Sequence, residues 1–185
     1  MKRIVFTGGP SAGKTSIINR LKESLQSDPT VFFAPEVASM LLGNGFPRCS
    51  YTENLIFQQK AIFNTQIEME GLLEKEKHFK ICFFDRGLMD ALAYIEDPTE
   101  ICPDTSLAMD HYDQIFHLEV APPFKYTRQN NQARTESYED ALKLENRLKE
   151  LWGSHPNYTF ISAENTFDEK FEAIFNSHLQ KLLDQ

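Results

Sequence analysis

Apolar runs of strand length recur along the chain, separated by stretches whose apolar residues repeat with a helical period. The runs cover residues 3–7, 30–34, 80–84, 114–120 and 158–162. They are continuously apolar rather than alternating, as parallel strands are when both faces of their sheet are buried. The pattern therefore predicts an α/β fold, in which helices cover both faces of a parallel sheet.

Helical periodicity and capping signals place the helices between these strands. The expected helices cover residues 37–42, 53–78, 136–152 and 168 to the C-terminus. Thr52 is the expected N-cap of the longest helix, and Thr166 and Glu169 form a capping box before the last one. Residues 43–50 and 96–104 are predicted loops. Ligands of such folds bind beyond the carboxyl ends of the strands, so the residues that follow each strand are the candidate site.

The first strand leads into a glycine-rich turn that matches G-x-x-x-x-G-K-[ST] at residues 8–15 and opens an amphipathic helix. This context is typical of a P-loop, whose backbone N–H groups surround phosphate at a helix N-terminus. Lys14 would reach the β- and γ-phosphates, and the Thr15 hydroxyl would bind Mg²⁺. Pro10 excludes the dinucleotide pattern G-x-G-x-x-G. The predicted nucleotide-binding residues are Gly8, Gly9, Ser11, Ala12, Gly13, Lys14, Thr15 and Ser16.

Two charged residues follow the third strand, in the sequence Asp85-Arg86-Gly87. An acid directly after a buried strand is where P-loop proteins hold Mg²⁺, so Asp85 is a predicted metal ligand. The alternative for Asp85 is the N-cap of a following helix. Arg86 would stabilise charge on a transferring phosphoryl group. Its alternative is an ion pair with a surface acid.

Glu36 follows the second strand and opens a short predicted helix. A carboxylate there faces the cleft, where it could take a proton from an attacking hydroxyl as a general base. The alternative is a first-turn glutamate that the helix dipole favours.

A polar stretch at about residues 121–135 brings together Lys125, Arg128 and Arg134 in a chain that is otherwise acidic. Clustered cations of this kind favour contact with phosphate, and the stretch is predicted to be a lid over the nucleotide. Arg134 lies nearest the next helix and is the predicted catalytic cation, while Arg128 is predicted to bind the nucleotide. The alternative is a solvated basic loop.

The predicted long helix carries glutamines among its apolar positions. Gln66 and Glu70 share a helix face at the spacing i, i+4. Gln58 or Gln59 could pair with the edge of a nucleobase, although most helical glutamines are simply solvated.

Composition narrows the class of protein. With 185 residues the chain fits one domain, and its net charge of −8 argues against nucleic acid and anionic membranes as partners. The three cysteines show no metal-binding spacing, and Cys82, inside an apolar run, is expected in the core. The first apolar run is too short for a signal peptide or a membrane span, so we expect a cytoplasmic protein.

These residues resemble the small P-loop proteins described as AAA-type predicted ATPases or kinases. That group includes the domain of the TRPL translocation defect protein and is similar to the ribosylnicotinamide-kinase domain of NAD-metabolism regulators. The matching segments are Phe6 to Pro10, Lys14-Thr15, Pro35-Glu36, Phe84 to Gly87 with Asp90, Asn130-Asn131 through Arg134-Thr135-Glu136, and Trp152 to Pro156.

The resemblance implies a three-layer P-loop NTPase fold of the nucleoside/nucleotide-kinase type, with a five-stranded parallel sheet in the order 2-3-1-4-5. It also implies the same roles for Glu36 as base, for Asp85 and Arg86 as an acid–arginine pair, and for Arg128 and Arg134 as lid cations. The catalytic residues we predict are therefore Lys14, Glu36, Asp85, Arg86 and Arg134.

Two functions remain open from the sequence. The first is a phosphotransferase that uses ATP and Mg²⁺ to phosphorylate a small nucleoside, nucleotide or riboside acceptor. The second is an NTP-hydrolysing or NTP-sensing switch that acts on a protein partner. A kinase needs a cavity beyond the γ-phosphate, lined by the helix after Glu36 and by the long helix. The guanine motifs N-K-x-D and T-K-x-D are absent from the sequence, which favours ATP over GTP.

Overall fold

A parallel sheet forms the centre of the molecule. The computed structural model describes residues 1–49, 52–124 and 137–175, and within these ranges the sheet has five strands in the order β2-β3-β1-β4-β5. All neighbouring strands pair in parallel, as predicted. The strands are β1 (Lys2–Thr7), β2 (Val31–Ala34), β3 (Ile81–Asp85), β4 (Gln114–Leu118) and β5 (Tyr158–Ile161).

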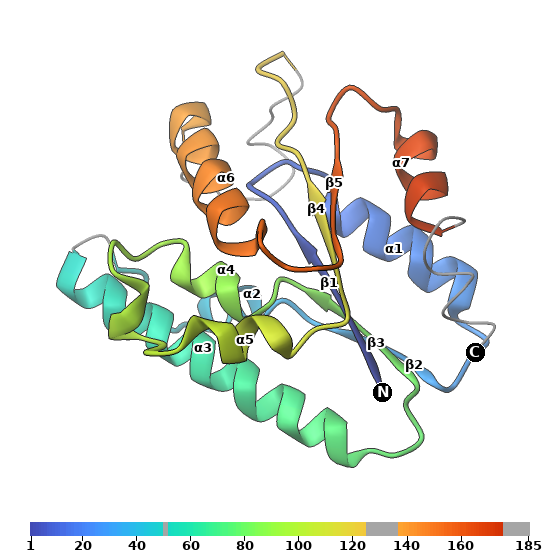
Figure 1. Ribbon diagram of the computed structural model, residues 1–185, viewed down its shortest axis with the longest axis horizontal. Helices are drawn as coiled ribbons and strands as arrows, with labels where there is room; N and C mark the ends of the chain where they lie inside the picture. Colours follow the sequence, from blue (N-terminus) through green and yellow to red (C-terminus); the bar gives the residue numbers. More distant parts are fainter. Residues whose placement is uncertain (50–51, 125–136, 176–185) are drawn as a thin grey trace.

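Helices cover both faces of the sheet (Figure 1). One face packs against α1 (Lys14–Leu25) and α7 (Phe167–Ile174). The opposite face packs against α2 (Val37–Gly43), α3 (Thr52–Lys75), α4 (Leu88–Leu92), α5 (Thr105–Asp110) and α6 (Tyr138–Trp152). The result is the three-layer arrangement expected from the sequence.

Two hydrophobic clusters fill the spaces between the sheet and its two helical layers. Successive strand residues point to opposite faces, so Ile4 and Phe6 join the cluster under α1 and α7, whereas Val5 joins the cluster under the other layer. The Phe6 ring stacks on Phe116 with a centroid distance of 5.5 Å. Both faces of β1 are therefore buried, which explains why its sequence is continuously apolar.

The helix bounds largely follow the sequence signals. The capping box of Thr166 and Glu169 opens α7 as predicted, and α3 ends at Lys75, slightly earlier than expected. The predicted loop at 96–104 includes a short 3₁₀ helix, Pro98–Glu100. Helices α4 and α5 were not predicted because each is less than two turns long, which is too short for a periodic pattern.

Close packing fixes the position of the turn after β1. Gly8 has a φ of 132°, and a Cβ atom on it would lie 2.1 Å from the carbonyl oxygen of Leu118 at the end of β4. The turn therefore rests directly on the neighbouring strand, and only glycine leaves room for that contact.

Among the helices of the described residues, none has an apolar stretch of the length needed to cross a bilayer. Cys82 is fully buried in the core, as expected.

We predict that Gly8→Ala destabilises the protein by more than about 3 kcal/mol, because the new methyl group meets backbone and the left-handed φ is strained. Gly71→Ala is the matched control: it lies inside α3 with nothing within 4 Å of an added Cβ. The control is expected to gain about 0.5–1 kcal/mol from helix propensity. Thermal or urea denaturation of both variants checks this, and an equally mild effect of the two substitutions would contradict it.

Candidate functional site

The P-loop adopts the curled conformation that its sequence predicts. Ser11 and Gly13 both have positive φ, 63° and 93°, and α1 begins at Lys14 directly after them. The buried Lys14 side chain folds over the loop, where its Nζ donates to the carbonyl oxygens of Gly8 at 2.7 Å and Gly9 at 3.1 Å. Burial lowers the pKa of Lys14 to about 8, and the Arg86 guanidinium adds to that effect. The hydroxyl-bearing residue Thr15 is exposed in the first turn of α1.

Arg86 joins the carboxylates of two different elements. Its Nε donates to Glu36 Oε1 at 2.6 Å, and its Nη1 donates to Asp90 Oδ1 at 3.0 Å. Burial alone would lower the pKa of Arg86, but Tyr94, Glu36 and Asp90 together raise it well above its ordinary value. Arg86 is therefore ion-paired, as its alternative held, but the side chains of its partners Glu36 and Asp90 are only 25% and 2% exposed and are not surface acids.

Asp90 is the residue of this group to which the sequence assigned no role. Its Oδ1 also accepts from the Thr7 hydroxyl at 2.8 Å, and its Oδ2 accepts from the Gly87 N–H and the Trp152 indole, both at 3.1 Å. A signal existed in the spacing, because an acid three residues after an N-cap residue can accept the N-cap N–H, as Asp90 accepts that of Gly87 at the start of α4.

Asp85 is the last residue of β3 and carries a buried carboxylate oxygen, Oδ1, without a hydrogen-bond partner in the described chain. Burial raises its pKa to about 6, against the attraction of Lys14. The N-cap of α4 is Gly87, so the alternative helix-capping role of Asp85 is wrong. A carboxylate oxygen left unpaired beside the P-loop lysine fits a cation ligand, because unpaired buried carboxylates are costly.

Mg²⁺ is commonly held by one or two protein oxygens plus phosphates and water. Asp85 and the exposed hydroxyl of Thr15 supply such a donor set. In the described residues no group of three or more His, Cys, Asp or Glu could form an all-protein metal cage.

Glu36 occupies the N-cap position of α2, yet its side chain makes no capping bond. Its carboxylate instead accepts hydrogen bonds from Arg86 and from the Ser39 hydroxyl. Burial would raise the pKa of Glu36, but Arg86, Ser39 and Lys14 hold it below its ordinary value. The carboxylate is therefore ionised at neutral pH, and its position at the N-terminus of α2 also favours its charge.

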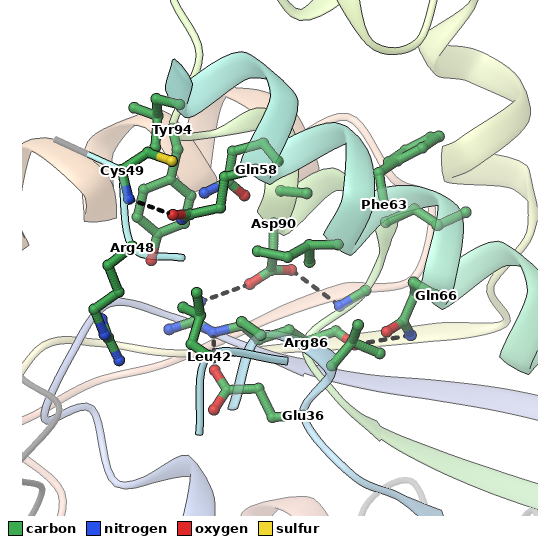
Figure 2. Close-up of a pocket in the computed structure, with 18 residues that line it drawn as sticks. Glu36, Leu42, Arg48, Cys49, Gln58, Phe63, Gln66, Arg86, Asp90 and Tyr94 are labelled. Carbon is green, nitrogen blue, oxygen red and sulfur yellow. Dashed lines mark hydrogen bonds and ion pairs between the residues drawn. The ribbon is translucent and has the colours of Figure 1, made fainter. Parts of the chain in front are cut away.

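A cavity of about 550 Å³ adjoins Glu36 and Arg86 and lies between α2, α3 and α4 (Figure 2). Its walls are mainly apolar, from residues such as Leu42, Leu55 and Phe63, with a few polar groups among them. The size and the lining are typical of small-molecule sites. This is the cavity that the phosphotransferase hypothesis requires after Glu36 and along the long helix.

The glutamines of α3 are buried at or beside this cavity, so the expectation that they are merely solvated is wrong. Gln58 uses its amide oxygen to accept the N–H of Cys49 at 2.7 Å, which holds the loop after α2 against α3. Gln66 donates to Glu70 at 2.5 Å, confirming that the two share a face.

A second, smaller hollow of about 220 Å³ lies on the other side of the P-loop. It is lined by loop residues including Ser11 and Gly13 and by Ala163, which follows β5. Glu119, directly after β4, accepts from the Ser162 hydroxyl at 3.0 Å and from the Ala163 N–H at 2.8 Å. The Ala163 N–H, which belongs to a residue lining this hollow, is therefore already engaged by the Glu119 carboxylate.

The predicted lid cations Lys125, Arg128 and Arg134 lie outside the described residues, as does most of the predicted lid. The structure brings Lys14, Glu36, Asp85 and Arg86 together at one end of the sheet, where burial and at least two of the other three residues shift the pKa of each.

Comparisons with known proteins bear on the family and the fold of the chain. A family model described as an AAA domain matches residues 3–170. Deoxyadenosine kinase from M. mycoides with the products dCMP and a flexible dCDP bound has a similar structure, with a TM-score of 0.64 and 16% identity over 96% of this chain and 99% of that chain. The same enzyme with dATP bound gives a TM-score of 0.62 and 16% identity over 95% and 98%. No curated protein matches the sequence. At such low identity the likeness concerns the fold, and it confirms the predicted nucleoside-kinase-like topology.

The unpaired Asp85 carboxylate is expected to destabilise the metal-free protein. Because its pKa is about 6 in the folded chain and 3.8 ordinarily, the stability that Asp85 itself contributes is lost as the pH rises from about 4 to about 6 and does not return above it. Asp85→Asn removes the carboxylate that titrates. The Tm of this variant should therefore exceed the wild-type Tm by about 5 °C at neutral pH and match it near pH ~4. Thermal denaturation with a chelator measures both, with the exposed Asp110→Asn as control. A neutral-pH Tm no higher than that of the wild type would contradict the expectation.

Proposed function

The chain belongs to the AAA-domain family of P-loop proteins, and we propose that it is a phosphotransferase which moves the γ-phosphate of Mg²⁺-ATP to a small-molecule acceptor. The acceptor would be of the nucleoside, nucleotide or riboside type. The observation that carries the proposal is the cavity of about 550 Å³, which is bordered by both Glu36 and Arg86 and so meets the charged groups around Lys14.

The phosphate chain would lie in the P-loop, with Lys14 against the β- and γ-phosphates. Asp85 and Thr15 would hold Mg²⁺, which neutralises charge on the phosphates when it is bound. Arg86, fixed by Glu36 and Asp90, would offer its positive charge to the transferring phosphoryl group from a nearly rigid position. Arg128 and Arg134 remain proposed phosphate contacts from the lid, and Arg134 is the proposed catalytic one.

Glu36 is the proposed general base. As the acceptor hydroxyl oxygen forms its bond to the γ-phosphorus, the bond from phosphorus to the bridging oxygen of the β-phosphate breaks and ADP leaves. The hydroxyl proton passes to the Glu36 carboxylate, which is ionised and faces the cavity. Catalysis would otherwise consist of positioning and charge stabilisation.

ATP is the proposed donor rather than GTP. The base would lie in the smaller hollow beside the P-loop, where Glu119 already accepts the N–H of the lining residue Ala163. A 6-oxo purine would need donors at its edge, and the Ala163 N–H is not available as one. The missing guanine motifs support the same choice.

The alternative function is an NTP-hydrolysing or NTP-sensing switch with a protein partner. The mainly apolar acceptor cavity favours the phosphotransferase, because a switch does not require a pocket for a second small molecule. We further propose a cytoplasmic enzyme made of one domain over residues 1–185, in keeping with its acidic surface charge and with no role in binding nucleic acid.

The test is ADP release from Mg²⁺-ATP across a panel of nucleosides, nucleotides and ribosides. We expect release to rise sharply with one acceptor class and a phosphorylated product to appear. Lys14→Ala should reduce nucleotide binding and turnover by at least about a hundredfold, because the phosphate contact is lost. Slow hydrolysis that no acceptor stimulates would favour the switch, and normal turnover by Lys14→Ala would contradict the P-loop mechanism itself.

Glu36→Gln should lower kcat about a hundredfold or more and leave the Kd for ATP nearly unchanged, because the amide cannot take the proton. Steady-state kinetics with the identified acceptor and direct ATP titration separate the two effects. The exposed Glu23→Gln on α1 is the matched control. An equal loss of ATP affinity and kcat would mean that Glu36 only holds Arg86 in place.

A further inference from the structure

Glu145 on α6 holds the backbone of the P-loop although it lies outside both cavities. Its Oε2 accepts the N–H of Gly9, the second glycine of the loop, at 3.0 Å. The side chain is 2% exposed and borders neither the acceptor cavity nor the smaller hollow. A buried carboxylate in contact with a phosphate-binding loop is unusual, because it adds negative charge near a site built for anions.

The other carboxylate oxygen of Glu145, Oε1, also has polar partners. It lies 2.9 Å from Nε2 of His117, a fully buried residue of β4, and 3.6 Å from Nζ of Lys149. Burial would raise the pKa of Glu145, but His117, Gly9 and Lys149 lower it below its ordinary value. The carboxylate is thus ionised, and β4 and α6 fix its orientation from two sides.

Packing around Gly9 shows how tightly the loop is placed against α6. A Cβ atom on Gly9 would lie 2.4 Å from Val120 Cγ2, just after β4, and 3.1 Å from the carbonyl oxygen of Ala141. The backbone of the loop therefore touches α6 directly at Gly9. The hydrogen bond to Glu145 determines which way the N–H of Gly9 points within that contact.

We propose that Glu145 is a positioning residue for the nucleotide. Glu145 fixes the backbone at the start of the P-loop by accepting the Gly9 N–H, and His117 holds the Glu145 side chain in place. The proposal rests on the proposed function in one respect, that the ligand of the loop is a nucleotide phosphate chain. A preorganised loop binds phosphate without first losing conformational freedom, so releasing Gly9 weakens phosphate binding. The acceptor cavity, which Glu145 does not touch, keeps its affinity.

The test uses three variants of the full chain. Glu145→Leu fills the volume without an acceptor, and Glu145→Asp keeps the charge but withdraws it by one methylene. Glu145→Gln is the matched control, because its amide oxygen still accepts the Gly9 N–H. Its amide nitrogen donates to Nε2 of His117 in the tautomer that carries the proton on Nδ1. Calorimetric titration with Mg²⁺-ADP and with inorganic tripolyphosphate measures phosphate binding without any turnover.

We expect Glu145→Leu and Glu145→Asp to weaken both ligands about tenfold, which is the effect of one lost hydrogen bond, while Glu145→Gln stays within about twofold. In kinetics, the KM for ATP should rise with little change in the KM for the acceptor. A merely structural Glu145 would lower Tm but leave the Kd of the folded protein unchanged.

If Glu145→Leu does not fold, the affinity of the shorter but still charged Glu145→Asp for the two ligands tests the proposal instead. Wild-type affinity in the variants that lose the contact would overturn this inference and leave the proposed function intact. A loss in Glu145→Gln as large as in Glu145→Leu would overturn the role of the hydrogen bond. Failure of the wild-type protein to bind either ligand would overturn the proposed function and this inference together.

Discussion

The Arg86 guanidinium is the interaction on which the rest of the site depends. It is largely buried, and it joins Glu36 after the end of β2 to Asp90 on α4. Asp90 in turn receives hydrogen bonds from Thr7 on β1 and Trp152 on α6. Removing one member would leave a buried charge without its partner, which is far more costly than never having buried the pair. This single network therefore holds the separate strand ends and the acceptor cavity in one fixed geometry.

The P-loop is constrained in a different way, by contact with backbone rather than by charge. Gly8 lies against the carbonyl of Leu118, and Gly9 lies against Val120 and α6. Both contacts need residues without a Cβ atom, so the glycines of the motif serve the packing of the domain as well as the phosphate cradle. The fixed position of the loop in turn fixes Lys14 relative to Asp85 and Arg86.

The same site concentrates groups that cost stability. Asp85 is buried with an unpaired oxygen and a raised pKa, and Lys14 is buried with a lowered one. Such groups are tolerated at sites where a bound ligand of opposite charge provides the partner that the protein itself does not provide. A metal ion beside Asp85 and phosphate beside Lys14 would each stabilise the charged form, so binding and folding are expected to reinforce one another.

The sequence by itself determined the features that depend on neighbouring residues: the strand runs, the capping box of α7, the P-loop and the acids that follow the strands. Strand order came from the family resemblance, and the roles of the site residues stay predictions. Only the tertiary structure decided which distant side chains meet. Gly9 and Glu145 are 136 positions apart, and Thr7 and Asp90 are 83 apart. The helix pattern could not decide between solvation and base pairing for Gln58 or Gln59, and only packing shows that the amide oxygen of Gln58 accepts the N–H of Cys49. Local propensity carries no information about such pairs, because they form only when the sheet order and the helix layers bring their elements together.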